Sequence, residues 1–485
     1  MSRKPNIVFL FTDDQRFDTI AALGNDEVRT PNLDRLVREG TTFTKAHIPS
    51  GTVGAICMPS RAMLHTGRTL FHLQDAGATI PEEHTLLGET LQSAGYASFG
   101  TGKWHNGPRS YARSFTAGGE VMFGGMADHW NVPMCHWDPT GSYDTRQPYI
   151  NDPFVTNRVQ HRHVDHIHFG RHSTDIVADH TVAFIRGHHG GRVGGEPFFT
   201  YTSFLAPHDP RTMPDEFLKM YDPAAIELPA SFVPEHPFEY GQRAIRDEVL
   251  APYPRTEEET RRHIAEYYAM ITHLDAAIGR IIRAVEERGE YENTLFVFAG
   301  DNGLACGKHG LMGKQSHYEH SVRVPLVFAG PGIPRNERRD AYAYLLDIYP
   351  TLCDLIGVQT PATVEGRSLV PALTDPAASV RDALYFAYAD LIRSAKDDRH
   401  KLTLYSHGNR NYAQLYDLND DPEELSNLLD GNTSGETEAD AKAIVEQLWA
   451  TITAFRDEWD DRESPWGAAF WDRFESNGGF AAAGT

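Results

Sequence analysis

Apolar residues occur along this chain in short runs of two kinds, which alternate. Residues 6–12 (Asn-Ile-Val-Phe-Leu-Phe-Thr) form a continuous apolar run, as a strand buried on both faces requires. A helix follows from Pro31, with apolar residues at helical spacing, and Gly40 ends it. Further strands are predicted at 198–205, 294–299 and 324–328, and a long helix at 264–285. Such alternation predicts an α/β fold, a large and mostly parallel sheet flanked by helices.

The pattern changes after residue 370. Two short strands, at 383–387 and 400–405, precede an amphipathic helix whose apolar stripe is Ile444, Leu448, Ile452, Phe455 and Trp459. We therefore expect two domains, a catalytic α/β domain over 1–370 and a smaller α+β domain over 371–485. The end of the chain is aromatic, with Trp466, Phe470, Trp471 and Phe474. We expect this tail to pack on its own domain, with a neighbouring subunit of a homo-oligomer as the alternative.

Composition and charge limit the partners. The chain has 485 residues, 40% of them hydrophobic, which is typical of a soluble globular protein. A net charge of −22 argues against a nucleic-acid partner, which would need a basic surface. No stretch approaches the ~20 apolar residues of a membrane span, so we expect no membrane partner. The first residues lack the apolar region of a signal peptide, and we expect a cytoplasmic enzyme, with a trimmed longer chain as the alternative.

Acidic and amide side chains follow two of the predicted strands directly. Asp13 and Asp14 come after the first strand, and Asp301 and Asn302 after the strand at 294–299. Since ligands bind beyond the carboxyl ends of strands in such sheets, these four side chains should meet at one edge. They offer oxygen ligands only, which suits Ca²⁺ or Mg²⁺ rather than Zn²⁺. Taken singly, the first pair would be a helix entry and the second a turn.

Residues 104–172 lack clear periodicity and form an insertion of the kind that lines a functional site. This segment is rich in histidine, with His161, His163, His166, His168 and His172. In an extended chain, the alternate positions of His161 and His163, and of His166 and His168, would share a face. A pocket wall that binds the sugar or carboxylate of a substrate is the favoured interpretation. A plain surface loop and a second metal site are the alternatives.

Cys57 is one of four widely spaced cysteines, and the other three (135, 306 and 353) are expected to be reduced thiols. Considered alone, Cys57 is either a small buried hydrophobe or a thiolate nucleophile at a helix start. However, Cys57-Met-Pro-Ser-Arg61 resembles the signature of the type I sulfatases, the formylglycine-dependent family of the alkaline phosphatase superfamily. The resemblance implies an alkaline-phosphatase-like fold. It also implies that a formylglycine-generating enzyme oxidises Cys57 to Cα-formylglycine, whose hydrate is the nucleophile and a metal ligand.

The resemblance extends from about residue 6 to residue 428 and implies a role for each of five further residues. Arg61 would hold a hydroxyl of the hydrate, and Lys103 would bind sulfate. His105 would be the base for sulfate release and His208 the acid for the leaving alcohol. Lys314 would neutralise charge at the bridging oxygen. Together with the metal, Arg61, Lys103 and Lys314 would make the site positive on an acidic protein. Taken singly, Lys103, Lys314, His105 and His208 would be ordinary surface lysines and core histidines.

The sequence thus predicts a sulfuric ester hydrolase that acts on a carbohydrate sulfate or another small organic sulfate. The candidates for contact with the non-sulfate part of the substrate are Arg162, His163, Arg211 and His309. A phosphonate or phosphate monoester hydrolase of the same superfamily is the alternative enzyme. A pseudoenzyme that binds sulfated glycans is the non-enzymatic alternative, and it would normally lose a nucleophile, acid or metal ligand, none of which is missing here.

Overall fold

The computed structural model describes residues 3–149, 159–188, 195–430 and 438–482. Its centre is an eight-stranded sheet in which β13 runs antiparallel to both of its neighbours and the remaining pairs are parallel. Across the sheet the strands are β14 (Glu337–Arg339), β2 (Gly40–Phe43), β13 (Leu326–Ala329), β12 (Thr294–Gly300), β1 (Asn6–Thr12), β11 (Phe198–Ser203), β5 (Ala97–Lys103) and β6 (Ala117–Met122). The predicted mostly parallel α/β sheet is confirmed.

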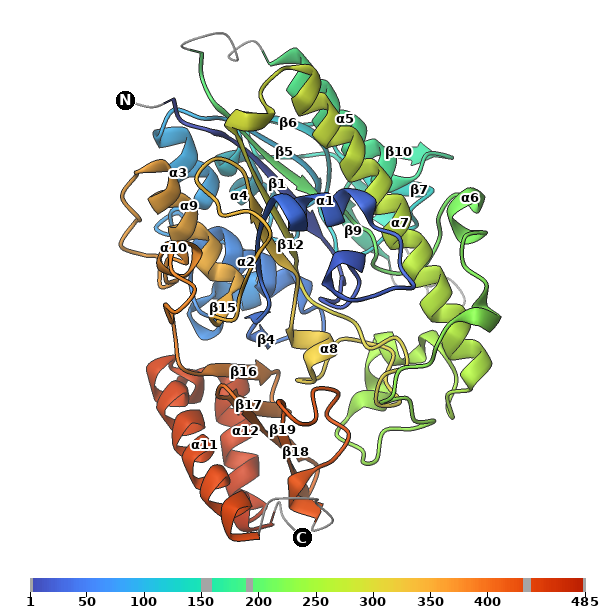
Figure 1. Ribbon diagram of the computed structural model, residues 1–485, viewed down its shortest axis with the longest axis vertical. Coiled ribbons are helices and arrows are strands. Elements are labelled where there is room, and N and C mark those ends of the chain that lie inside the picture. The colour runs from blue at the N-terminus through green and yellow to red at the C-terminus, as the bar shows by residue number, and fades with distance from the viewer. Residues whose placement is uncertain (1–2, 150–158, 189–194, 431–437, 483–485) are drawn as a thin grey trace.

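Helices cover both faces of this sheet (Figure 1). One face carries α1 (Pro31–Glu39), α5 (Ser173–Gly187) and α7 (Glu257–Glu287), and the other carries α2 (Cys57–Thr66), α3 (Leu87–Ser93), α4 (Pro108–Ser114) and α9 (Ile348–Ile356). In β1, Val8 and Leu10 pack in the hydrophobic core on the face of α1, α5 and α7. Phe9 and Phe11 pack in the core on the opposite face. Because alternate residues of a strand face opposite sides, a strand covered on both faces is apolar throughout.

Several elements differ in extent from the sequence prediction, among them α7 and β13. The long helix α7 begins at Glu257, seven residues before the predicted start at residue 264. Its first turn is acidic and is capped by the Thr256 side chain, which accepts a hydrogen bond from the backbone N–H of Glu259 at 3.2 Å. The strand predicted at 324–328 is the antiparallel β13. Within the described ranges, no helix combines the length and the apolar character that crossing a bilayer requires.

The insertion at 104–172 contains two small antiparallel pairs, and its residues 150–158 lie outside the described residues. β7 (Asn131–Met134) pairs with β10 (His166–Phe169), and β8 (Arg146–Tyr149) pairs with β9 (Gln160–His163). Other short elements are β3 (Ala46–His47), β15 (Ala343–Tyr344), α6 (Asp215–Leu218), α8 (Glu319–Val322) and α10 (Val370–Thr374).

A second sheet lies at the C-terminal end of the molecule (Figure 1). It is the antiparallel series β16 (Leu384–Tyr388), β17 (Ile392–Lys396), β18 (His400–His407) and β19 (Arg410–Asp417), extended by β4 (Ser50–Gly51) in parallel to β16. Helices α11 (Glu438–Glu458) and α12 (Pro465–Ser476) share its core. The tail residues Phe470, Trp471 and Phe474 are buried there, so the tail packs on its own sheet as expected. The predicted domain division at residue 370 stays a prediction.

Candidate active site

The acidic pairs that follow β1 and β12 meet at the edge of the main sheet. The two strands pair in parallel up to Thr12 and Gly300. The backbone N–H of Asp14 donates to Oδ1 of Asp301 at 3.1 Å. Asp14 has a φ of 66°, a left-handed conformation that aspartate adopts more readily than most residues. All four predicted metal ligands, Asp13, Asp14, Asp301 and Asn302, are buried and lie within this one group.

The oxygen atoms of this group fit a divalent cation. Oδ1 of Asp13 and Oδ1 of Asn302 are buried and accept no hydrogen bond from any described residue. Burial and then the neighbouring charge of Asp13 raise the pKa of Asp301 to about 7. Three carboxylates packed together repel each other unless positive charge lies between them. Buried oxygens without donors and with mutual repulsion are the donor set that Ca²⁺ or Mg²⁺ binds.

Cys57 occupies the first position of α2 and is 2% exposed. Its Sγ lies 3.4 Å from Nδ1 of His105 and 3.4 Å from Nζ of Lys103. Burial raises the pKa of the Cys57 thiol to about 11. Burial and the nearby Lys103 charge lower the pKa of His105 well below its ordinary value. At neutral pH the thiol is therefore protonated and the imidazole neutral, which disfavours a thiolate nucleophile and suits His105 as a base.

Lys103 reaches the site because β5 is irregular just before it. The pairing of β5 with β6 shifts register between Gly100 and Gly102. Gly102 has a φ of 91°, and a Cβ added there would lie 1.8 Å from the carbonyl oxygen of Ser203, so only glycine fits. Such a bulge re-aims the residues that follow it. Lys103 Nζ forms an ion pair with Asp13. Burial alone would lower the pKa of Lys103, but the attraction to Asp13 and its neighbours outweighs burial, so the pKa is raised.

Arg61 lies one helical turn after Cys57 and is 1% exposed. Its Nε and Nη2 lie 2.9 Å from Oδ2 of Asp301, and its Nη1 donates to the hydroxyl of Ser203 at 2.5 Å. The guanidinium thus orients one of the predicted metal ligands. The predicted hydrogen bond from Arg61 to a hydroxyl of the Cys57 hydrate stays a prediction.

His208 and Lys314 lie beside the same group, next to Asp14. Nδ1 of His208 lies 2.8 Å from the carbonyl oxygen of Asp209, so Nδ1 carries a proton and donates it. Its Nε2 faces Asp14, at 3.7 Å from Oδ2. Nζ of Lys314 donates to Oδ1 of Asp14 at 2.6 Å. The structure therefore brings together all ten residues that were predicted to be catalytic or metal-binding, and their individual roles stay predictions.

A pocket of about 480 Å³ opens over this group. Cys57, His105, His208 and Lys314 line its base, and Arg162 is in its wall. The other three candidates for substrate contact have different neighbours. His163 Nδ1 lies 2.8 Å from the carbonyl oxygen of Tyr143, and Arg211 lies 2.5 Å from Nδ1 of His263.

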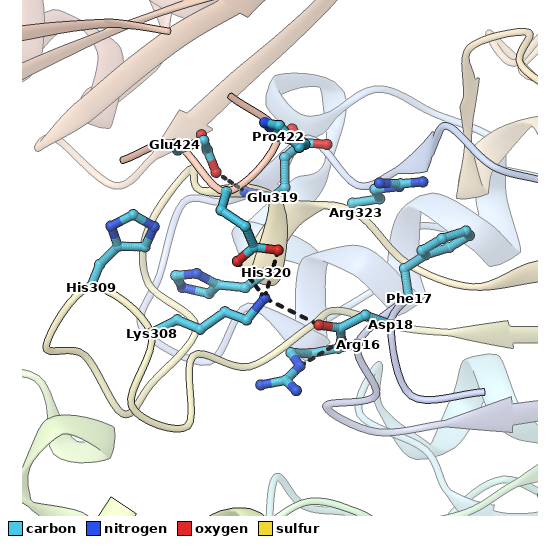
Figure 2. A pocket seen from close by; sticks show the side chains of 11 residues that line it. Arg16, Phe17, Asp18, Lys308, His309, Glu319, His320, Arg323, Pro422 and Glu424 are labelled. Atoms are coloured by element: carbon cyan, nitrogen blue, oxygen red, sulfur yellow. Dashed lines mark hydrogen bonds and ion pairs between the residues drawn. The ribbon is translucent and has the colours of Figure 1, made fainter. Parts of the chain in front are cut away.

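His309 lines a separate pocket, in which Lys308 reaches Asp18 at 3.1 Å (Figure 2). The ring of His309 stacks on Tyr318 with centroids 3.9 Å apart. Among the described residues, this pocket shares none of its lining with the pocket above Cys57. The geometry thus keeps Arg162 as a candidate substrate contact and gives no support to His163, Arg211 or His309.

The sequence analysis missed four polar residues of the pocket wall: Arg246, Asp247, Gln315 and Tyr388. Arg246 Nη1 donates to Oδ1 of Asp209, the residue that follows His208, at 2.8 Å. Tyr388 belongs to β16, where it pairs with Gly51 of β4, so the C-terminal sheet supplies part of the pocket. Gln315 is adjacent to Lys314 and could have been found by that neighbourhood. Arg246, Asp247 and Tyr388 lie in segments without a sequence motif that would mark them as part of a functional site.

Comparison with known proteins gives two family matches. The family model described as "Sulfatase" matches residues 5–358. The model described as "N-sulphoglucosamine sulphohydrolase, C-terminal" matches residues 307–455. An arylsulfatase of Clostridium perfringens is 29% identical over 456 residues, which cover 88% of this chain and 90% of the relative.

Solved structures share the fold across nearly the whole chain. A phosphonate monoester hydrolase of Agrobacterium radiobacter has a TM-score of 0.70 at 22% identity, with 94% of this chain and 96% of that chain covered. A protein solved in complex with its substrate D-glucosamine-2-N,6-O-disulfate has a TM-score of 0.70 at 21% identity, with 95% and 99% covered. At these identities the likeness concerns the fold.

Proposed function

The chain belongs to the sulfatase family of the alkaline phosphatase superfamily, and on that premise we propose that it hydrolyses a sulfate ester with a formylglycine formed from Cys57. The observation that carries the proposal is the position of Cys57, 3.4 Å from both Lys103 and His105 and beside buried oxygens that lack donors. The modification requires a formylglycine-generating enzyme during maturation. A protonated thiol explains why an unmodified Cys57 would be a poor nucleophile at neutral pH.

The first chemical step transfers the sulfuryl group. One hydroxyl of the hydrated aldehyde would attack sulfur and pass its proton to a neighbouring carboxylate of Asp13 or Asp301, while the bond between sulfur and the ester oxygen breaks. His208 gives a proton to that oxygen, so the alcohol leaves neutral. The acid is the ring with a proton on both nitrogens, because the Nδ1 proton is held by the carbonyl of Asp209 and the Nε2 proton is the one that is given. Lys103 and Lys314 offset the negative charge of the sulfate.

The second step releases sulfate. His105 removes the proton from the remaining hydroxyl, the carbon–oxygen bond to the sulfate breaks, and the aldehyde re-forms before water hydrates it again. A neutral imidazole is the form that accepts this proton, and burial keeps His105 neutral. Ca²⁺, or Mg²⁺, held by Asp13, Asp14, Asp301 and Asn302 together with the hydrate, would supply positive charge against the carboxylates and the sulfate.

We propose a carbohydrate sulfate as the first substrate class to test. The pocket volume of about 480 Å³ is within the range of small-molecule sites. Its wall offers charged and amide groups from Arg162, Arg246, Asp247 and Gln315, with the ring of Tyr388 beside them. Hydrogen-bonding groups next to an aromatic ring suit a sugar better than a purely aromatic alcohol. The solved protein that binds D-glucosamine-2-N,6-O-disulfate shares this fold.

Phosphonate ester hydrolysis is the second candidate, because a phosphonate monoester hydrolase is among the proteins of this fold. The test compares turnover of sulfated mono- and disaccharides, an aryl sulfate and a matched aryl phosphonate by the formylglycine-containing protein. The proposal expects the sulfates to be the better substrates by kcat/KM. A higher kcat/KM for the phosphonate would replace sulfatase by phosphonate hydrolase. No turnover of any of them by fully modified protein would favour a sulfated-glycan-binding pseudoenzyme.

A further inference from the structure

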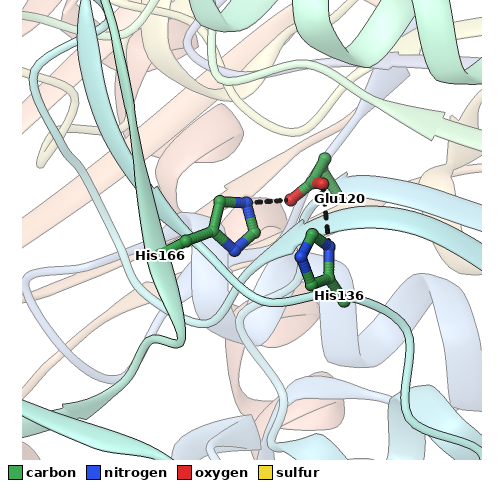
Figure 3. Close-up of side chains that lie close together, drawn as sticks. All are labelled: Glu120, His136 and His166. Carbon is green, nitrogen blue, oxygen red and sulfur yellow. Dashed lines mark hydrogen bonds and ion pairs between the residues drawn. The ribbon is translucent and has the colours of Figure 1, made fainter.

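A second cluster of metal-ligand side chains surrounds Glu120, outside the pocket above Cys57 (Figure 3). Nδ1 of His136 lies 3.1 Å from Oε1 of Glu120, and Nε2 of His166 lies 2.7 Å from Oε2. Nε2 of His168 lies 3.5 Å from Oε2, and Nε2 of His180 lies 4.0 Å from Oε1. Four imidazoles from three segments of the chain thus converge on one carboxylate.

The local fold explains why these side chains meet. Glu120 is in β6, at the edge of the main sheet. The next residue, Val121, forms a bridge with Cys135, which brings His136 beside Glu120. β10 pairs with β7 so that His166 lies opposite Met134, and the alternation of a strand puts His168 on the same side as His166. The pairing of the two small strands with the bridge to β6 therefore assembles the cluster.

The cluster has the donors and spacing of a tetrahedral metal site. Glu120 is only 4% exposed, and its Oε2 accepts a hydrogen bond from no described residue. Nε2 of His166 and Nε2 of His168 lie 3.2 Å apart. Zinc bonds of about 2.0–2.1 Å to histidine and carboxylate place neighbouring donors about 3.3 Å apart in a tetrahedron. The separations of 2.7–3.5 Å that join Glu120 to these histidines and His166 to His168 are close to that spacing, and the donor atoms of Glu120, His136 and His166 all lie within 4.8 Å of one another.

We propose that Glu120, His136, His166 and His168 bind a transition-metal ion of the Zn²⁺ class. Imidazole nitrogens with one carboxylate oxygen suit Zn²⁺, whereas the oxygen-only group at Asp13 suits Ca²⁺, so the two sites select different ions. The ion links three segments: β6, the residues that follow β7, and β10. It thereby fixes the insertion to the edge of the sheet. Gly125 and Met126, which follow β6, line the catalytic pocket, so this fixation holds part of the pocket wall in place.

An ion-paired cluster without metal is the competing interpretation. In it, protonated histidines would neutralise Glu120 directly, and His166 also has Asp165 as an ion-pair partner. The two interpretations differ in what they require. Protonated rings repel each other across the 3.2 Å between His166 and His168, whereas neutral rings present lone pairs to a shared ion. Only the metal interpretation predicts stoichiometric uptake of one ion.

The test uses untagged full-length protein saturated with Ca²⁺, so that the oxygen site is occupied. One equivalent of Zn²⁺ is added, the protein is passed over a gel-filtration column, and bound metals are measured by mass spectrometry. We expect one zinc per chain, and a loss of at least ten-fold in zinc content for the double variant His136→Gln/His166→Gln. Calcium content should stay unchanged. His161→Gln is the matched control, because His161 is an exposed histidine of the same insertion and should keep its zinc.

A second measurement does not depend on whether the variant folds. The wild-type protein loaded with Co²⁺ in place of Zn²⁺ should show the intense visible absorption of a tetrahedral ion. X-ray absorption at the zinc edge should show a nitrogen and oxygen shell at about 2.0–2.1 Å with no sulfur. Wild-type protein that emerges from the column without zinc would overturn the proposal, as would a folded double variant that keeps its zinc. Zinc ligated by sulfur would show that the ion is not held by the proposed ligands alone and would also overturn it.

Discussion

The Sγ atom of Cys57 lies 3.4 Å from Nδ1 of His105, the distance of a nucleophile beside its base. In cysteine hydrolases such a pair reacts because the thiol has a low pKa and gives its proton to the imidazole. Here burial raises the pKa of the thiol to about 11, and it lowers the pKa of His105 well below the ordinary value. The proton therefore stays on sulfur. The geometry is that of a nucleophile, yet the side chain as encoded lacks the reactivity, which is the reason to expect its conversion to formylglycine.

The first prediction concerns this conversion. The peptide that contains Cys57 should lose about 18 Da relative to the unmodified cysteine form, the change from a thiol to an aldehyde. Cys57→Ser should still bind substrate but lose turnover, because a serine cannot expel sulfate by collapsing to an aldehyde. Mass spectrometry of the tryptic peptide and steady-state kinetics check the two parts. Full activity of Cys57→Ser would contradict the mechanism.

The second prediction concerns the oxygen site. Exhaustive chelation should abolish turnover and lower the thermal midpoint, because Asp13, Asp14 and Asp301 would be left to repel each other. Added Ca²⁺, with Zn²⁺ resupplied in both arms, should restore both in the wild-type protein. In Asp14→Ala the same Ca²⁺ concentration should restore neither. An active protein without metal, or stoichiometric zinc at this site, would show that the oxygen set has been misinterpreted.

The meeting of these carboxylates was predictable from sequence because it follows from topology. Strands 6–12 and 294–299 were recognisable as buried parallel strands, and residues after such strands share an edge of the sheet. Tyr388 could not be predicted, since its place in the pocket depends on the pairing of β16 with a two-residue strand 337 positions earlier in the chain, at Gly51. No local pattern encodes such a contact.

The histidines of the insertion likewise show that sequence patterns predict local geometry but not contacts between distant segments. The alternation of His166 and His168 was visible in the sequence, and the structure confirms that they share a side. Their common partner Glu120 was not visible, because it is 46 residues before His166 and is brought there by the bridge between Val121 and Cys135. His309 was a candidate for substrate contact, but it lines a separate pocket, because the conformation of its loop determines where its ring lies and sequence spacing does not reveal that conformation.

The third prediction concerns acid stability. Burial lowers the pKa of His236 to about 4, whereas a histidine in an unfolded chain titrates near 6.5. Between these values the unfolded state binds a proton that the folded state does not, so stability is full above about pH 6.5 and falls as pH falls toward 4. The shift corresponds to a loss on the order of 3 kcal/mol over that window.

The measurement is the thermal midpoint as a function of pH. His236→Gln should lose less stability than the wild-type protein between pH 6.5 and 4.5, because glutamine has no proton to bind. His161→Gln should follow the wild-type curve, since His161 is exposed. Parallel curves for all three proteins would mean that folding does not lower the pKa of His236.

The fourth prediction concerns the C-terminal sheet. The carboxylate of Asp461 is buried and accepts hydrogen bonds from Arg393 at 2.7 and 2.8 Å, from Tyr385 at 2.7 Å and from Trp471 at 2.9 Å. Asp461→Ala leaves the Arg393 charge buried without this partner, which should cost about 3–5 kcal/mol in the free energy of unfolding. Asp460→Asn is the control, because its side chain is 63% exposed and asparagine tolerates the left-handed φ of 55° at this position, and it should cost about 1 kcal/mol or less. Denaturant unfolding of both variants measures the difference, and equal losses would contradict the prediction.

The last prediction separates the two histidines of the mechanism by their dependence on the leaving group. A general acid helps in proportion to the basicity of the departing oxygen. A sugar alkoxide is strongly basic, whereas a nitrophenolate leaves without a proton. His208→Ala should therefore reduce turnover of a sugar sulfate by roughly 10²–10⁴-fold and that of a nitrophenyl sulfate far less.

His105→Ala is the matched comparison, because its Nδ1 lies beside Cys57 and its proposed step, the release of sulfate, is common to both substrates. Its effect on turnover should be similar for the sugar sulfate and the nitrophenyl sulfate wherever that release limits the rate. His208 in turn lines the pocket, and its Nε2 lies 3.7 Å from Oδ2 of Asp14. If His208→Ala reduces turnover of both substrates equally while His105→Ala discriminates between them, the acid is His105 and the two assignments must be exchanged.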